Sequence, residues 1–192
     1  MELSVLVVSA ALVLDLTAAS AQTAAPSAGA SDPGNMTRFS RAIRERYNNI
    51  KRDIVEAAEA MPEGEYSFKP TPQVRSFGEI VGHIVDAQSF FCGVAGGGNP
   101  QYSDAIEKSK TTKAELLKAL KDSTAACDAV YSATTSANVL GLERAGQGDA
   151  LRGMFLMDNV SHDSEHYGNI VTYMRLKGRV PPSTARARKA EP

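Results

Sequence analysis

Two histidines four residues apart, in the stretch NVSHDSEHYGNI, are the residues of this chain best placed to do chemistry. Residues at that spacing on a helix lie within roughly 40° of one another, so His162 and His166 can present both imidazoles to one ion. His83, in FGEIVGHIVDAQ, is the third histidine. Three neutral imidazoles suit an open site for a divalent metal. The sequence predicts such a site, and ordinary core or surface histidines are the alternative.

The surroundings of the histidine pair favour the metal interpretation. The same helix strip is apolar towards its ends and polar in the middle, at Asp158, His162, His166 and Asn169. Polar residues within an apolar strip are costly unless they are paired or bind something. We expect Asp158, one turn before His162, to accept an imidazole N–H or to act as a general base.

Other acidic residues lie near the histidines in the sequence. Asp86 follows His83 by one turn of helix, and we leave it open between a site role and a structural one. Asp163 and Glu165 flank the ligand positions, and we expect them on a solvated helix face.

Four helical segments are expected to position these residues. They run from about residue 35 to 60, from Ser76 to the AGGGNP stretch, from Thr112 to about 131, and from about 149 to 177. Ser76 with Glu79 and Thr112 with Glu115 are capping boxes, in which each side chain satisfies a free backbone N–H of the first turn. Gly178 is the expected C-terminal stop of the last helix.

The composition agrees with a helical fold. The chain is 43% hydrophobic and 6% aromatic and has no tryptophan. No strand-like alternation stands out, so the sequence predicts an all-α four-helix bundle. The linkers 95–111 and 132–148 are longer than adjacent antiparallel helices require. They indicate that at least one pair of sequential helices runs parallel.

The two cysteines can test that topology. Cys92 and Cys127 lie near the ends of the second and third helices. Parallel neighbouring helices would bring them to the same height, where an exported protein could form a disulfide. Antiparallel helices would separate them by about 20 Å, beyond disulfide reach. Buried free thiols are the default interpretation.

The two ends of the chain differ in sequence character from the helical region between them. Residues 1–21 resemble a secretory signal with a small-x-small cleavage site at Ala19-Ser20-Ala21, and residues 22–34 resemble a disordered leader. A bundle domain over 35–182 and a disordered basic tail over 183–192 follow. We therefore expect export to the periplasm or beyond, with no stable membrane anchor, because the apolar run is too short to span a bilayer.

The net charge of the chain and a second apolar arc on its last helix indicate which partners to expect. The formal net charge is −1, which gives no reason to expect nucleic acid as a partner. The last helix carries a second apolar arc, which indicates either deep burial or a homodimer contact, and we favour the dimer. The residues of this arc are Leu156, Val160, Ile170, Val171 and Met174.

Two blocks, FKPTPQVRSFGEIVGHIVDAQ and NVSHDSEHYGNIVTYMRLKG, resemble the DinB-like family of damage-inducible helical bundles over roughly residues 36–182. The resemblance implies a bundle whose second and third helices are parallel. It also implies a divalent metal on a mid-helix histidine and an H-x-x-x-H pair, which fall on His83, His162 and His166. Relatives include thiol-dependent transferases and isomerases that use bacillithiol or mycothiol.

Two functions follow as expectations. The first is a metal-dependent hydrolase or thiol transferase acting on a small molecule, with zinc or nickel as the metal and iron or manganese as alternatives. The second is a non-catalytic, metal- or ligand-binding helical bundle of the periplasm. A bundle without metal that serves only in interactions is a third reading.

Overall fold

The computed structural model describes residues 33–145 and 148–190, and helices dominate them. The expected signal sequence at 1–21 lies outside the described residues, as does the expected leader up to residue 32. In the part of the chain that is described, no helix is both long and apolar enough to cross a membrane.

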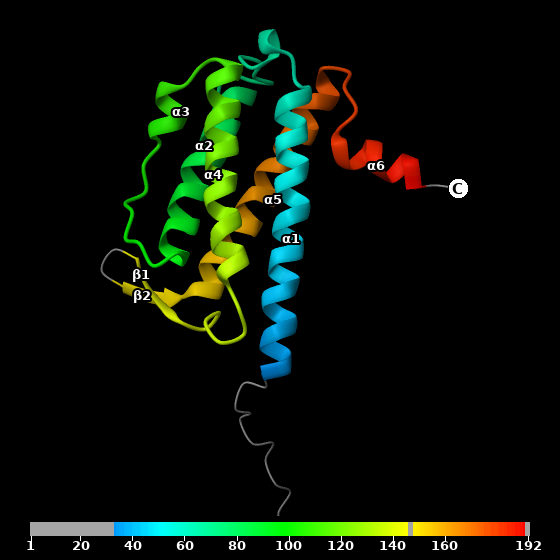
Figure 1. Cartoon of the computed structure of the whole chain (residues 1–192). Helices are drawn as coiled ribbons and strands as arrows, with labels where there is room; N and C mark the ends of the chain where they lie inside the picture. The colour runs from blue at the N-terminus through cyan, green and yellow to red at the C-terminus, as the bar shows by residue number, and fades with distance from the viewer. Residues whose placement is uncertain (1–32, 146–147, 191–192) are drawn as a thin grey trace, which may run out of the picture. The chain divides into compact units, whose positions relative to one another are not determined.

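Four long helices confirm the predicted all-α class (Figure 1). They are α1 (Pro33–Ala60), α2 (Phe77–Ala95), α4 (Lys113–Ala133) and α5 (Arg152–Leu176). Both predicted capping boxes form, at the starts of α2 and α4. Gly178 adopts a φ of 70° directly after α5, a left-handed conformation that glycine takes without a Cβ clash.

The helices α2 and α4 run parallel, as predicted. Gln88 on α2 pairs with Ser123 on α4, and Cys92 pairs with Cys127 four residues further along both helices. By contrast, α5 runs antiparallel to α2 (Figure 1). Arg75, just before α2, contacts Tyr173 near the end of α5. Phe91, near the end of α2, packs against His162 in the first half of α5. The parallel pair requires the chain to return along the bundle between them, and this crossover contains the short helix α3 (Ala105–Ser109).

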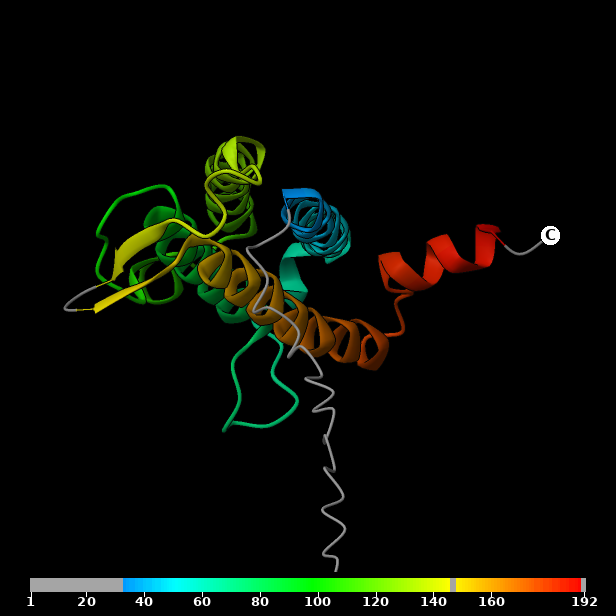
Figure 2. The same cartoon turned by 90° about the horizontal axis from the view of Figure 1, so that it is seen from below.

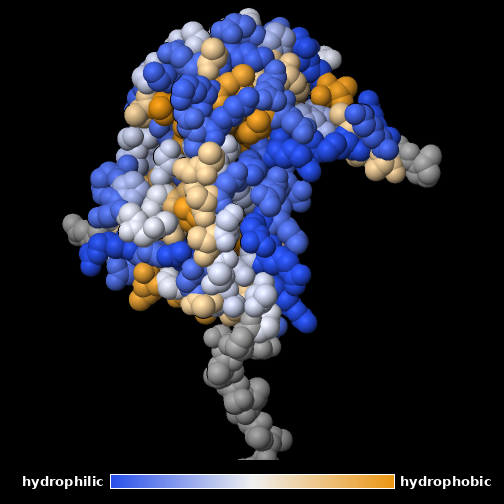
Figure 3. Space-filling view, in the orientation of Figure 1, coloured by the Kyte–Doolittle hydropathy of each residue, from blue (hydrophilic) through white to orange (hydrophobic). Residues whose placement is uncertain are grey.

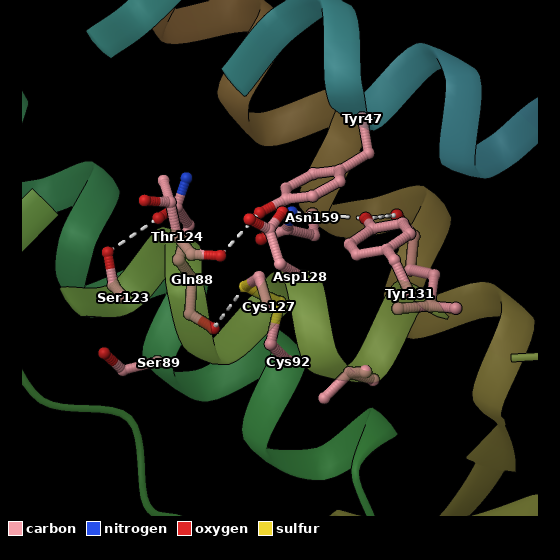
Figure 4. The surroundings of a disulfide bond; sticks show 12 residues. Tyr47, Gln88, Ser89, Cys92, Ser123, Thr124, Cys127, Asp128, Tyr131 and Asn159 are labelled. Carbon is pink, nitrogen blue, oxygen red and sulfur yellow. Dashed lines mark hydrogen bonds between the residues drawn. A yellow bond between two sulfur atoms is a disulfide. The ribbon is translucent and has the colours of Figure 1, made fainter. Parts of the chain in front are cut away.

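The predicted default of free thiols is wrong, because Cys92 and Cys127 form a disulfide. Their Cα atoms lie 5.3 Å apart, and both residues are buried. Figure 4 shows the bond joining α2 to α4, with the Cys127 sulfur also near the Gln88 carbonyl oxygen. The parallel orientation of the two helices places both cysteines at the same height, which is the condition under which a bond was expected.

The linker before α5 holds two short strands that the sequence did not predict. β1 (Leu142–Ala145) pairs antiparallel with β2 (Gly148–Leu151), with Leu142 opposite Leu151. As a result α5 begins at Arg152 rather than at about residue 149. Arg152 also donates from Nε to Glu143 Oε1 over 2.8 Å, so the hairpin and the first turn of α5 are tied together.

The C-terminal residues also differ from expectation. The tail expected to be disordered forms helix α6 (Pro182–Ala190) in its described part. Arg186 explains this order, because its guanidinium pairs with Asp53 and Glu56 on α1. Tyr167 on α5 adds a hydrogen bond from its hydroxyl to Ser183 Oγ, of 2.9 Å.

The second apolar arc of α5 packs inside the chain. Leu156, Ile170 and Met174 are at most 1% exposed and belong to the core of the bundle. Deep burial, the other interpretation of this arc, therefore accounts for these three residues. On the face drawn in Figure 3, hydrophobic residues form small groups separated by hydrophilic ones.

A buried polar network crosses the middle of the bundle. Ser123 Oγ on α4 donates to Gln88 Oε1 on α2, and Gln88 Nε2 donates to Asp163 Oδ2 on α5 over 2.9 Å. Gln88 and Asp163 are fully buried. The expectation that Asp163 lies on a solvated face is therefore wrong, whereas Glu165 is exposed as expected. Burial raises the pKa of Asp163 to about 7, although the Gln88 hydrogen bond acts against the shift.

Candidate metal centre

The three histidines of the chain converge on one point between α2 and α5. His162 Nε2 lies 3.1 Å from His83 Nε2 and 3.2 Å from His166 Nε2. Among the described residues, these three histidines form a group that could hold a metal ion. The helical spacing of the pair and the antiparallel packing of α2 on α5 bring all three together, as the sequence predicted.

The separations suit a metal ion better than hydrogen bonds among the rings. Two ligands at about 2.0–2.1 Å from one ion lie roughly 2.9–3.4 Å apart at tetrahedral or octahedral angles. A neutral imidazole has one N–H and one lone pair, so three Nε2 atoms facing one another cannot all be satisfied by each other. A cation at their centre would accept all three lone pairs. The residues present therefore fit a divalent metal.

The protonation state of the cluster also suits a metal. Burial, together with the neighbouring His166, His83 and Arg75, lowers the pKa of His162 to about 4. Burial and His83 likewise lower the pKa of His166. Both rings are therefore neutral at pH 7, which is the form that binds metals.

Glu107, in the crossover helix α3, fixes the tautomer of His83. Its Oε2 lies 3.1 Å from His83 Nδ1, and its Oε1 accepts from Arg75 Nε over 2.8 Å. A carboxylate beside Nδ1 requires the proton on that nitrogen, which leaves the lone pair of Nε2 facing the other histidines. Tyr102 adds its hydroxyl 3.2 Å from the same Nδ1. No local signal in the sequence pointed to Glu107.

Two residues of α2 hold α3 in place. Asp86 accepts the backbone N–H groups of Ile106 and Glu107, at 2.9–3.1 Å. Gly82 allows the close approach, because a Cβ there would lie 2.7 Å from Glu107 Cα. Asp86 therefore has the structural role that the sequence left open, and it positions Glu107 against His83.

Asp158 does not reach the histidines. Its side chain is exposed, while His162 Nδ1 is buried without a hydrogen-bond partner. The polar neighbour of His166 is instead Asn169, whose amide lies 3.3 Å from Nδ1. The buried polar residues of α5 are Asn159, Asp163 and His166, and Asp158 is not among them.

Comparisons with known proteins agree with this fold and site. The family model of the DinB superfamily matches residues 47–170, which include all three histidines. The chain belongs to the DinB superfamily. The crystal structure of a DinB-like protein from Bacillus cereus ATCC 10987 is similar, with a TM-score of 0.62 and 17% identity over 74% of this chain and 95% of that one. At this identity the likeness shows the fold alone. No curated protein matches the sequence.

An open pocket reaches the histidine cluster of this DinB superfamily member. It has a volume of about 570 Å³ and is lined by His166, Asn169 and Tyr173 of α5, by Glu107, and by residues of the loop and first turn that begin α2. Volumes of this order are typical of small-molecule sites. The pocket gives a small molecule a path to the cluster.

Replacing Glu107 by alanine is expected to weaken zinc binding by about 10–100-fold, because His83 would lose the carboxylate that fixes its tautomer. Competition with a chromophoric zinc chelator measures the dissociation constant. Glu45, which is exposed on α1, provides the matched control, and Glu45→Ala should bind zinc as the parent does. Equal affinities for Glu107→Ala and the parent would show that the contact does not act on the metal site.

Proposed function

We propose that this protein is an exported DinB-superfamily metalloprotein that acts as a hydrolase or thiol transferase on a small molecule. The main support is the convergence of three imidazole nitrogens beside an open pocket. His162 Nε2 lies 3.1 Å from His83 Nε2 and 3.2 Å from His166 Nε2. Zinc or nickel is the proposed metal, with iron or manganese as alternatives, because three imidazoles suit several divalent ions.

The residues present have separate roles in such a centre. His83, His162 and His166 would hold the ion, which supplies positive charge that lowers the pKa of a water or thiol bound in an open position. Glu107 holds the proton on His83 Nδ1. The pocket wall orients the substrate next to His166. Asp158 has no part in this proposal, because its side chain is exposed and no hydrogen bond joins it to a histidine of the cluster among the described residues.

The disulfide supports export. Disulfides persist in oxidising compartments such as the periplasm and are rare in the cytosol. The Cys92–Cys127 bond is thus consistent with the secretory signal expected at 1–21. A homodimer remains a proposal that rests on Val160 and Val171 alone, the two residues of the apolar arc of α5 that are only half-buried.

One observation favours the alternative of a non-catalytic metal- or ligand-binding bundle. Glu107 is the carboxylate in contact with a histidine of the cluster, and both of its oxygens are already engaged, by Arg75 and by His83. It is therefore poorly placed to act as a general base. Turnover that disappears on removal of the metal would establish the enzyme, and metal binding without turnover would establish the alternative.

Metal content tests the proposal. Untagged residues 22–192, purified without chelators, are expected to hold about one metal ion per chain by inductively coupled plasma mass spectrometry. His83→Ala and His162→Ala should both lose it. Asp158→Asn, one turn from His162 and exposed, is the matched control and should retain it. A parent protein that takes up neither zinc, nickel nor manganese would overturn the proposal.

A further inference from the structure

We infer that the pocket beside the three histidines binds a small organic carboxylate. Its carboxylate group pairs with Arg75, while a second donor atom of the same molecule reaches the metal. The inference rests on the proposed metal centre and names the substrate class for it.

Arg75 offers an unused pair of hydrogen-bond donors to the pocket. Its Nε donates to Glu107 Oε1, but Nη1 and Nη2 have no partner among the residues that the structure describes. The side chain is 42% exposed, so these groups are open to a ligand. A guanidinium stays charged at every physiological pH, and its planar fork matches the two oxygens of a carboxylate.

The acidic residues of the pocket are already occupied by protein groups. Glu107 uses both oxygens, on Arg75 and on His83. Glu79 Oε2 accepts from the Ser76 backbone N–H and pairs with Lys69 over 2.9 Å. The formal charges of the two bases and two acids cancel. A divalent ion on neutral imidazoles then leaves the pocket positive, which favours an anionic ligand.

The backbone that carries Arg75 is fixed before any ligand arrives. Tyr173 on α5 donates its hydroxyl to the Arg75 carbonyl oxygen over 2.8 Å. The next residue, Ser76, is the N-cap of α2. A site that is already ordered binds without the entropic cost of ordering its own loop.

The remaining residues of the pocket wall indicate the size and polarity of the rest of the ligand. Pro72, Val74 and Ile80 give the pocket an apolar part between the loop and α2. Arg75 connects to His83 through the single carboxylate of Glu107. By ordinary bond and hydrogen-bond lengths, the guanidinium then lies at most about 12 Å from the ion. A chain of a few carbon atoms between the carboxylate and the metal-binding atom, with one hydrogen bond and one metal bond at its ends, spans about 10 Å, a length of the same order.

Two matched thiols test the inference in the cobalt-loaded full chain. The probes are 3-mercaptopropionate and its neutral amide, 3-mercaptopropionamide, and the readout is the sulfur-to-cobalt charge-transfer absorption. The acid is expected to bind at least about tenfold more tightly than the amide, through the charge-assisted pair with Arg75. Arg75→Gln should reduce this ratio to about one, and Arg75→Lys should give an intermediate value.

Cobalt affinity is measured separately for each variant, and all thiol titrations are made at saturating cobalt, because Arg75 also contacts Glu107. Lys69→Gln is a second variant that leaves Glu107 untouched, and it should lower the ratio severalfold. Lys118→Gln is the control, since Lys118 pairs with Asp122 on the exposed side of α4. Its ratio should equal that of the parent.

The outcomes separate the two proposals. A parent chain that does not bind cobalt overturns the metal centre itself. Bound cobalt with equal affinity for acid and amide overturns only the carboxylate pocket, as does a parent-like ratio in Arg75→Gln. Bound cobalt without charge-transfer absorption from either thiol also overturns the pocket.

Discussion

Replacing Cys92 and Cys127 together by alanine is expected to lower the free energy of unfolding by about 3–4 kcal/mol. The disulfide closes a loop whose ends are 35 residues apart. In the chain-entropy model, opening a loop of that length restores this much conformational entropy to the unfolded chain. For a domain of this size the melting temperature should fall by about 10 °C.

Urea unfolding of the metal-free protein measures the difference. The parent treated with reductant should unfold at the same urea concentration as the double variant, and the variant itself should be insensitive to reductant. A difference below about 1 kcal/mol would mean that the bond is absent or that the unfolded chain is already compact there.

Asp163→Asn is expected to remove most of a large pH dependence from the stability of the metal-free protein. Burial raises the pKa of this carboxyl to about 7 from its ordinary value of 3.8. Its contribution to stability is therefore fully present below pH 3.8 and is lost as the pH rises through 7. Between pH 4 and pH 8 the parent should lose about 4 kcal/mol relative to the variant. The asparagine oxygen can still accept from Gln88.

Urea unfolding at a series of pH values, with chelator present, measures this difference. The lowered pKa of His162 makes the free energy of unfolding rise with pH, which is opposite to the effect of Asp163. This contribution is the same in both proteins, so it cancels when they are compared. The exposed Asp158→Asn variant is the control and should follow the parent at every pH. Parallel stability curves for Asp163→Asn and the parent would show that folding does not raise the pKa of Asp163.

The features that could be predicted from the sequence are those with local signals. Capping boxes at Ser76 and Thr112 mark helix starts by side chain to backbone pairing within four residues. The i, i+4 histidine pair needs only helix geometry. The two long linkers indicated that at least one pair of sequential helices is parallel, because adjacent antiparallel helices need only short connections. The resemblance to the DinB-like family, not the linker length, assigned this pair to the second and third helices.

The features that were missed depend on contacts between distant residues. Asp163 looked like a surface aspartate, and its burial depends on Gln88, 75 residues away on α2. Glu107 reaches His83 only because Gly82 and Asp86 hold the crossover helix against α2. The strands β1 and β2 have four residues each, too few for alternation to stand out.

The parallel arrangement of α2 and α4 has a consequence for how such a site can diversify. In a bundle of successive hairpins, the connections would lie at the two ends and leave the flank of His83 bare. Here the returning segment runs alongside α2 and contributes Glu107 and Tyr102 to the histidine cluster. Substitutions in this segment can therefore retune the metal and its ligand while the four long helices, which carry the stability of the domain, stay unchanged.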